Sequence, residues 1–169
     1  MAVREILLLG NPALYRVAEP VSQDELPDLK AVAEDLRDRL LDFRRRHGRG
    51  RAIAAPQLGV SKRLIYWDTG EPRIIVNPVL EQLSPDTFEL WDDCMSFPDL
   101  LVRVVRHRRC SVRFRDLEWN ETVWQLEDAL SELIQHEYDH LEGILATQRA
   151  INLRSLAIRT QIKPDLSGH

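Results

Sequence analysis

The sequence predicts an α+β fold, because its helical and strand-like segments are grouped and do not alternate. A helical pattern comes first, at residues 22–47, and short strand-like segments fill the middle of the chain. Two further helical patterns, at about residues 127–142 and from about residue 152 onward, close it. Regular alternation of strand and helix would have favoured an α/β fold instead.

The first helix is predicted from a capping pattern and a helical repeat. Ser22 is followed three residues later by Glu25, as in a capping box, and Pro27 suits an early helical turn. Apolar residues then recur at helical spacing until about His47. These residues are Leu29, Val32, Leu36, Leu40 and Phe43.

The middle of the chain predicts short antiparallel strands. Residues 64–67 and 73–76 flank a turn at residues 69–70, and Asn77-Pro78 is expected to end the second strand. Val112 and Phe114 alternate with polar residues, and Val123 continues the pattern after a polar turn. This alternation predicts a hairpin with one face in water.

The last part of the chain predicts two helices and a tail. The helix at about residues 127–142 should stop at Gly143, which is a typical C-cap residue. A third helix is expected near Asn152, carrying Leu153, Leu156 and Ile158. The length fits one domain, residues 1–163, and residues 164–169 are expected to be a frayed tail.

Composition excludes several classes of protein. Apolar residues make up 44% of the chain and charged residues 30%, so the chain can bury a core. The net charge of −4 argues against sequence-specific nucleic-acid binding. The N-terminal apolar run, residues 6–9, is too short for a signal peptide, and no membrane span is expected. We therefore expect a cytoplasmic protein.

The strongest chemical signal is the run of residues 136–140, which matches HExxH. His136 and His140 are four residues apart, so on a helix both imidazoles can reach one ion. Glu137 is placed to act as a general base toward a water molecule activated by that ion. The alternative interpretation is a solvated helix that matches the pattern by chance.

A catalytic ion needs a third protein ligand. No glutamate follows Glu142, and Ala146 stands where a metzincin-like chain has its last histidine, so both large protease classes fit poorly. Cys94, which lies in an irregular stretch, is the best candidate for the third ligand, whereas Cys110 is interpreted as a buried structural cysteine. A thiolate with two imidazoles suits Fe(II), Zn(II), Ni(II) or Co(II). The candidates considered are His47, His107, His169, Cys94 and Cys110.

Three motifs in order resemble those of the peptide deformylase family, whose members remove the formyl group from N-formylmethionine at the start of newly made chains. Residues 50–57 (GRAIAAPQ) resemble GxGLAAPQ, residues 92–96 (DDCMS) resemble EGCLS, and residues 135–143 (QHEYDHLEG) resemble QHExDHLxG. Residues 11–14, 18–21 and 75–78 are also similar to the family, so the resemblance covers essentially the whole chain.

The resemblance implies a fold and a set of roles. The fold would place antiparallel or mixed sheets around a central HExxH helix, with N-terminal and C-terminal helices, and residues 1–163 would form the catalytic domain. One divalent ion, with Fe(II) favoured, would be held by three ligands, with an acid/base and two oxyanion donors beside it. The ligands would be Cys94, His136 and His140, the acid/base Glu137, and the donors the Gln57 amide and the backbone N–H of Met95.

The sequence departs from the family mainly where substrate would bind. Ala52 and Asp93 replace glycines, so their side chains could crowd the peptide path. Arg51 and Glu132 stand where the family often has apolar residues, and Leu101 lies in the region of a usual arginine. Behind the site, Asp139 and Arg106 are expected to pair and to orient the metal helix.

Three hypotheses follow for the function. The first is deformylation of N-formylmethionyl peptides; the second is a paralogue that deformylates or deacylates another small N-acyl substrate; the third is a non-catalytic protein that kept the fold. Retention of all five candidate metal and catalytic side chains speaks against the third. A ribosome contact through the C-terminal helix is a further expectation.

Overall fold

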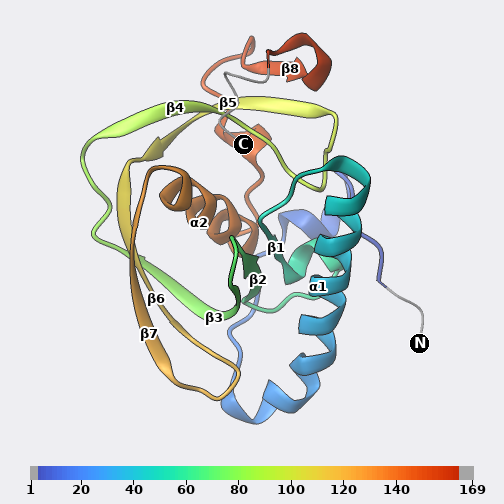
Figure 1. Ribbon diagram of the computed structural model, residues 1–169, viewed down its shortest axis with the longest axis vertical. Coiled ribbons are helices and arrows are strands. Elements are labelled where there is room, and N and C mark those ends of the chain that lie inside the picture. The colour runs from blue at the N-terminus through green and yellow to red at the C-terminus, as the bar shows by residue number, and fades with distance from the viewer. Residues whose placement is uncertain (1–3, 164–169) are drawn as a thin grey trace.

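The computed structural model describes residues 4–163, in which sheets surround a central helix (Figure 1). The α-helices of this part of the chain are α1 (Leu26–His47) and α2 (Asp128–Leu141). α2 lies in the middle of the molecule, and α1 runs along one side of it (Figure 1). The grouped order of elements confirms the α+β prediction.

Two antiparallel sheets enclose α2. The larger sheet has the order β1-β2-β3-β6-β7, and the smaller has the order β4-β5-β8. The strands of the larger sheet are β1 (Ala52–Ala54), β2 (Leu64–Asp68), β3 (Pro72–Glu81), β6 (Arg109–Arg115) and β7 (Glu121–Glu127). Those of the smaller sheet are β4 (Thr87–Asp92), β5 (Leu100–His107) and β8 (Leu156–Ile158).

Short 3-10 helices connect these elements. They are η1 (Pro12–Tyr15), η2 (Gln23–Glu25), η3 (Ala55–Leu58), η4 (Ala146–Arg149) and η5 (Arg159–Gln161). None of the helices among residues 4–163 is long and apolar enough to cross a bilayer.

α1 forms where the sequence predicts it. The Glu25 carboxylate accepts a hydrogen bond from the backbone N–H of Ser22 at 2.8 Å, and η2 leads into the helix. All five predicted apolar positions of α1 are buried and pack in one cluster with β1 and β2. The helix ends at His47, followed by Gly48 in the left-handed conformation.

α2 and the β6–β7 hairpin are also confirmed. Leu133, Ile134 and Leu141 of α2 pack in a second cluster with residues of the larger sheet. Gly143, at φ +71°, follows the helix, and a Cβ there would lie 2.6 Å from the Tyr15 carbonyl oxygen, so only glycine fits. In the hairpin, Val112 and Phe114 are buried as predicted, but Val123 does not continue this apolar face, because it is exposed opposite Arg113.

β3 does not end at Asn77-Pro78 as predicted. The strand continues to Glu81 through a bulge between Val76 and Val79, with Asn77 at φ +50°. The Asn77 side chain accepts a hydrogen bond from the Val21 N–H at 2.8 Å and donates one to the Val21 carbonyl at 2.7 Å. A proline at a bulge costs no ladder hydrogen bond, which is why the strand survives it.

The predicted C-terminal helix is wrong. Leu156 pairs with Val102 of β5, so residues 156–158 form an edge strand, β8. The Asn152 side chain accepts a hydrogen bond from the Arg154 N–H at 2.8 Å, and this local turn competes with a helix start. The described residues thus offer no C-terminal α-helix for a ribosome contact, and the predicted tail, residues 164–169, lies outside them.

We expect Leu40→Ala to lower the free energy of unfolding by about 2–5 kcal/mol, because Leu40 is fully buried and the truncation leaves a cavity. Leu41→Ala, on the adjacent and 46% exposed position of the same helix, is the matched control and should cost less than about 1 kcal/mol. Denaturant titration measures both. Equal losses would contradict the packing of α1 described above.

Candidate active site

Three potential metal ligands meet beside α2. The Nε2 atoms of His136 and His140, one turn apart on the helix, lie 3.2 Å from each other. The Sγ atom of Cys94 lies 3.3 Å from Nε2 of His140. All three side chains are buried, and their ligand atoms lie within 4.8 Å of one another. A thiolate and two imidazoles at this spacing fit a single divalent transition-metal ion.

Cys94 is held by the loop between β4 and β5. The backbone N–H of Ser96 donates to its sulfur at 3.5 Å, and the Phe97 N–H donates to its carbonyl at 3.1 Å. Gln57, in η3, also donates its side-chain amide to the sulfur at 3.5 Å. The Ser96 and Gln57 donors fix the sulfur and complement negative charge on it, and the Phe97 contact fixes the backbone of the loop.

Asp92, at the end of β4, orients His136. Its Oδ2 accepts hydrogen bonds from His136 Nδ1 at 2.9 Å and from Arg106 at 3.0 Å. The proton on Nδ1 leaves Nε2 as the atom that faces Cys94 and His140. Asp92 stands where the EGCLS motif has its glutamate, and the sequence did not predict this contact.

Burial and charge act against each other on this pair. Burial opposes ionisation of Asp92, but His136 and then Arg106 hold its pKa well below the usual range. Burial opposes protonation of His136, but the Asp92 carboxylate raises the pKa of this imidazole well above its usual range. For His140, burial and then the charge of His136 lower the pKa.

The structure pairs Arg106 with Asp139 behind the helix. Arg106 donates to Asp139 Oδ2 at 2.6 Å, and both residues are buried. Arg149, in η4, also contacts Asp139, with hydrogen bonds of 2.6 and 2.8 Å. Arg149 was not singled out from the sequence, because nothing local marks a lone arginine as the partner of a carboxylate on another element.

Glu137 and Gln57 face the same space. Glu137 is buried, and its Oε2 has no hydrogen-bond partner among residues 4–163. Burial raises the pKa of Glu137 to about 7. Gln57 accepts the Ala54 N–H at 2.9 Å through Oε1 and donates Nε2 to Ser96 Oγ at 3.1 Å, so its amide nitrogen points toward Cys94.

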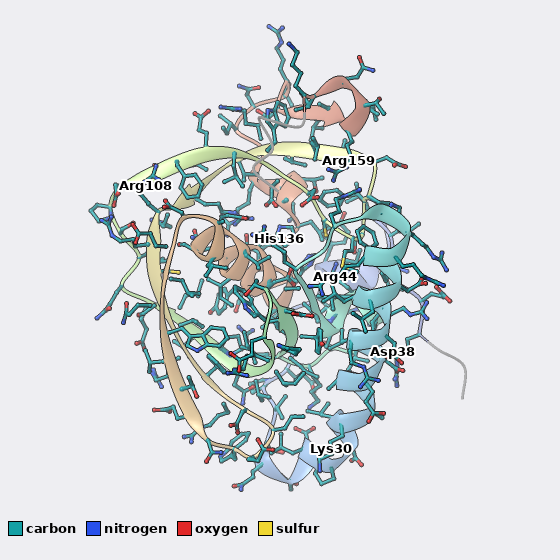
Figure 2. The ribbon with its side chains drawn as sticks, in the orientation of Figure 1. Lys30, Asp38, Arg44, Arg108, His136 and Arg159 are labelled. Carbon is teal, nitrogen blue, oxygen red and sulfur yellow. The ribbon has the colours of Figure 1, made fainter. Side chains whose placement is uncertain are left out.

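A cavity of about 350 Å³ joins these groups. Figure 2 shows His136 at the centre of the molecule, with Arg44 of α1 to one side and Arg159 of the C-terminal segment above. Leu101 is buried in β5 and does not line the cavity. The lining includes Gln57, Asp92, Cys94, Met95, His136 and Glu137, and also Phe43, Arg49, Arg51, Ala52, Asp93, Glu132 and Leu133.

Ion pairs hold the two acidic side chains predicted near the substrate. The Asp93 carboxylate lies 2.7 Å from Arg159 and 3.3 Å from Arg49, so two arginines bind it. Glu132 Oε1 lies 2.5 Å from Arg51. Arg49 and Arg159 were missed from the sequence, where they lie far from Asp93.

The fold and the site define a metal-dependent hydrolase with an HExxH helix at its centre. A family model described as polypeptide deformylase matches residues 3–155. Among curated proteins, the chain is 31% identical to a peptide deformylase of Thermotoga maritima over 159 residues, 93% of each chain. It is 35% identical to one of Hyphomonas neptunium over 151 residues, 86% of this chain and 83% of the relative.

Solved structures of peptide deformylases are also similar to this chain. The Thermotoga maritima peptide deformylase superimposes with a TM-score of 0.81 at 29% identity, covering 90% of this chain and all of that one. The Legionella pneumophila enzyme gives 0.80 at 34% identity, covering 90% of this chain and 88% of that one. The chain therefore belongs to the polypeptide deformylase family, which confirms the resemblance of the three motifs.

Membership defines the activity class. The chain is an enzyme, a metallohydrolase that removes the formyl group from N-formylmethionyl peptides. Neither a different N-acyl substrate nor a non-catalytic role is favoured by these relatives.

We expect iodoacetamide to alkylate Cys94 before Cys110 in the folded, metal-free protein. Cys94 lines the cavity, whereas Cys110 is buried beneath Ser131, and burial raises the pKa of its thiol. Mass spectrometry of the modified peptides gives both rates, and the denatured protein, in which both thiols should react alike, is the control. Equal rates in the folded state would contradict this placement of the two cysteines.

Proposed function

We propose that Cys94, His136 and His140 hold the single ion of this enzyme, with Fe(II) as the favoured metal. The convergence of their three ligand atoms within 4.8 Å carries this proposal. The Asp92 contact supports it, because it leaves His136 Nε2 free to bind a metal. Fe(II), Zn(II), Ni(II) and Co(II) all suit this donor set. When bound, such an ion makes a water nucleophile available near neutral pH and polarises a carbonyl group.

Glu137 is the proposed proton carrier. It is adjacent to His136 and lines the same cavity, with one carboxylate oxygen free to accept a proton. In the proposed reaction Glu137 takes a proton from the attacking water and passes it to the departing amine nitrogen. A carboxylate that accepts a proton and later donates it must lie beside the ion without being one of its ligands.

Gln57 and Met95 are the proposed oxyanion donors. Attack on the formyl carbon places negative charge on one oxygen, and donors fixed in advance stabilise this charge most in a site that excludes water. The Gln57 amide is fixed because its Oε1 is held by the Ala54 N–H. The backbone N–H of Met95 directly follows Cys94 in the chain.

The proposed substrate is the formylated end of a nascent peptide, reached through the cavity. Its lining includes Gln57, Cys94, Met95, His136 and Glu137. We place the reaction in the cytoplasm, where such chains are synthesised. Asp139 and Arg106 are proposed to hold α2 in place behind the ion, as their buried ion pair supports.

We expect Glu137→Gln to keep one ion per chain but to lose at least about 10²-fold in kcat/KM on a formyl-Met tripeptide, because proton transfer loses its carrier. The anaerobically prepared Fe(II) protein should be assayed beside Glu127→Gln, an exposed glutamate immediately before α2, as the matched control.

Cys94→Ala should behave differently and lose the ion itself, whereas Cys110→Ala should keep it. Activity of Glu137→Gln within a few-fold of the parent enzyme would contradict the role of Glu137. Normal metal content in Cys94→Ala would contradict the ligand set.

A further inference from the structure

One wall of the active-site cavity carries an ion pair. Glu132 lies one helical turn before His136 on α2, and its side chain is almost completely buried. Arg51 directly precedes β1, which packs beside α2 (Figure 1). The two charged groups are 2.5 Å apart, and both residues line the cavity that contains Cys94 and Glu137.

Arg51 has more N–H donors than its two hydrogen bonds on this wall use. Its guanidinium carries five N–H groups. One nitrogen donates to Glu132, and another donates to the Ala129 carbonyl at 3.1 Å in the first turn of α2. These two hydrogen bonds use two of the five N–H groups, and 27% of the Arg51 side chain is exposed. The charge is thus fixed in position on a side chain that lines the cavity and is partly exposed.

This wall lies within reach of the first side chain of a substrate. A peptide whose formyl carbon is at Glu137 and His136 has its first α-carbon within about 4 Å of that carbon. Glu132 and Leu133 are one helical turn away, about 5.4 Å along the helix axis. A methionine-sized side chain that extends along α2 therefore lies against Leu133 and ends at Arg51 and Glu132.

We propose that Arg51 and Glu132 make this subsite polar, so that the enzyme prefers a first side chain that ends in a hydrogen-bond acceptor. This inference rests on the proposed function and narrows its substrate class. The methionine thioether is a weak acceptor, and a sulfoxide or an amide is a strong one. A hydrocarbon side chain such as that of norleucine displaces water from the Arg51 guanidinium and accepts no hydrogen bond from it. An N–H donor of Arg51 is then buried without a partner, which costs free energy.

The test compares formyl-X-Ala-Ser peptides in which X is methionine, norleucine, methionine sulfoxide or glutamine. We expect kcat/KM for the sulfoxide or glutamine peptide to exceed that for norleucine by about tenfold, the discrimination expected for one unsatisfied buried donor. Methionine should fall between them. If the enzyme hydrolyses the norleucine peptide as fast as the sulfoxide and glutamine peptides, the inference is overturned.

A double substitution tests the residues themselves. Arg51→Leu with Glu132→Leu removes both charges together, because removing one alone leaves the other buried and unpaired. We expect the double variant to prefer norleucine over the sulfoxide. The matched control replaces the exposed pair Arg73 and Glu71 by leucine and should keep the parent preference. An unchanged preference in the folded Arg51/Glu132 variant would show that the pair only links α2 to β1.

A binding measurement separates this inference from the proposed function. Titration calorimetry of the deformylated products, X-Ala-Ser, reports on the subsite without any turnover. Tighter binding of the sulfoxide product than of the norleucine product supports the polar subsite even if no formyl peptide is hydrolysed, a result that would overturn only the proposed function. Equal binding of the two products overturns the polar subsite.

Discussion

The buried guanidinium of Arg106 joins the two parts of the active site. From β5 it reaches Asp92, at the end of β4, and Asp139, on α2. Asp92 lies two residues before Cys94 and also holds His136, so one cation fixes the cysteine loop relative to the histidine helix. Loss of one partner from such a buried network leaves an uncompensated charge, which typically costs about 3–5 kcal/mol. The relative placement of the three proposed metal ligands therefore depends on this network.

The hydrophobic clusters support the same arrangement from three sides. α2 packs against the larger sheet through Leu133, Ile134 and Leu141. Met95 belongs to the cluster beneath α1, whereas its neighbour Cys94 belongs to the cluster of the smaller sheet. The loop that carries the thiol is thus anchored in two cores, and a loop so anchored can present a rigid ligand.

The sequence predicts the parts of this molecule that are encoded by local patterns. α1, α2 and the β6–β7 hairpin each follow a periodicity within a few turns or a few residues, and His136, Glu137 and His140 are close together on one helix. Cys94 was preferred as the third ligand because it lies in an irregular stretch, whereas Cys110 lies at the approach to a strand; the comparison of motifs then supported this choice. The order of the three motifs then identified the family.

The sequence does not predict what depends on long-range pairing. β8 forms because β5 offers it a free edge, and residues 156–158 by themselves read equally well as part of a helix. The sequence predicts only that the Asp93 side chain could crowd the peptide path, yet Arg49 and Arg159 bind its carboxylate from 44 and 66 residues away. Leu101 fell in a motif-flanking region but is buried in a strand. Only tertiary contacts decide these cases.

X-ray absorption spectroscopy of the metal-loaded enzyme tests the ligand set most directly. With zinc as the probe, we expect one sulfur at about 2.3 Å and two imidazole nitrogens at about 2.0–2.1 Å in the first shell. The sulfur contribution should come from Cys94, the cysteine whose Sγ lies beside both histidines. A first shell of nitrogen and oxygen alone, in a protein that holds one ion per chain, would contradict the assignment.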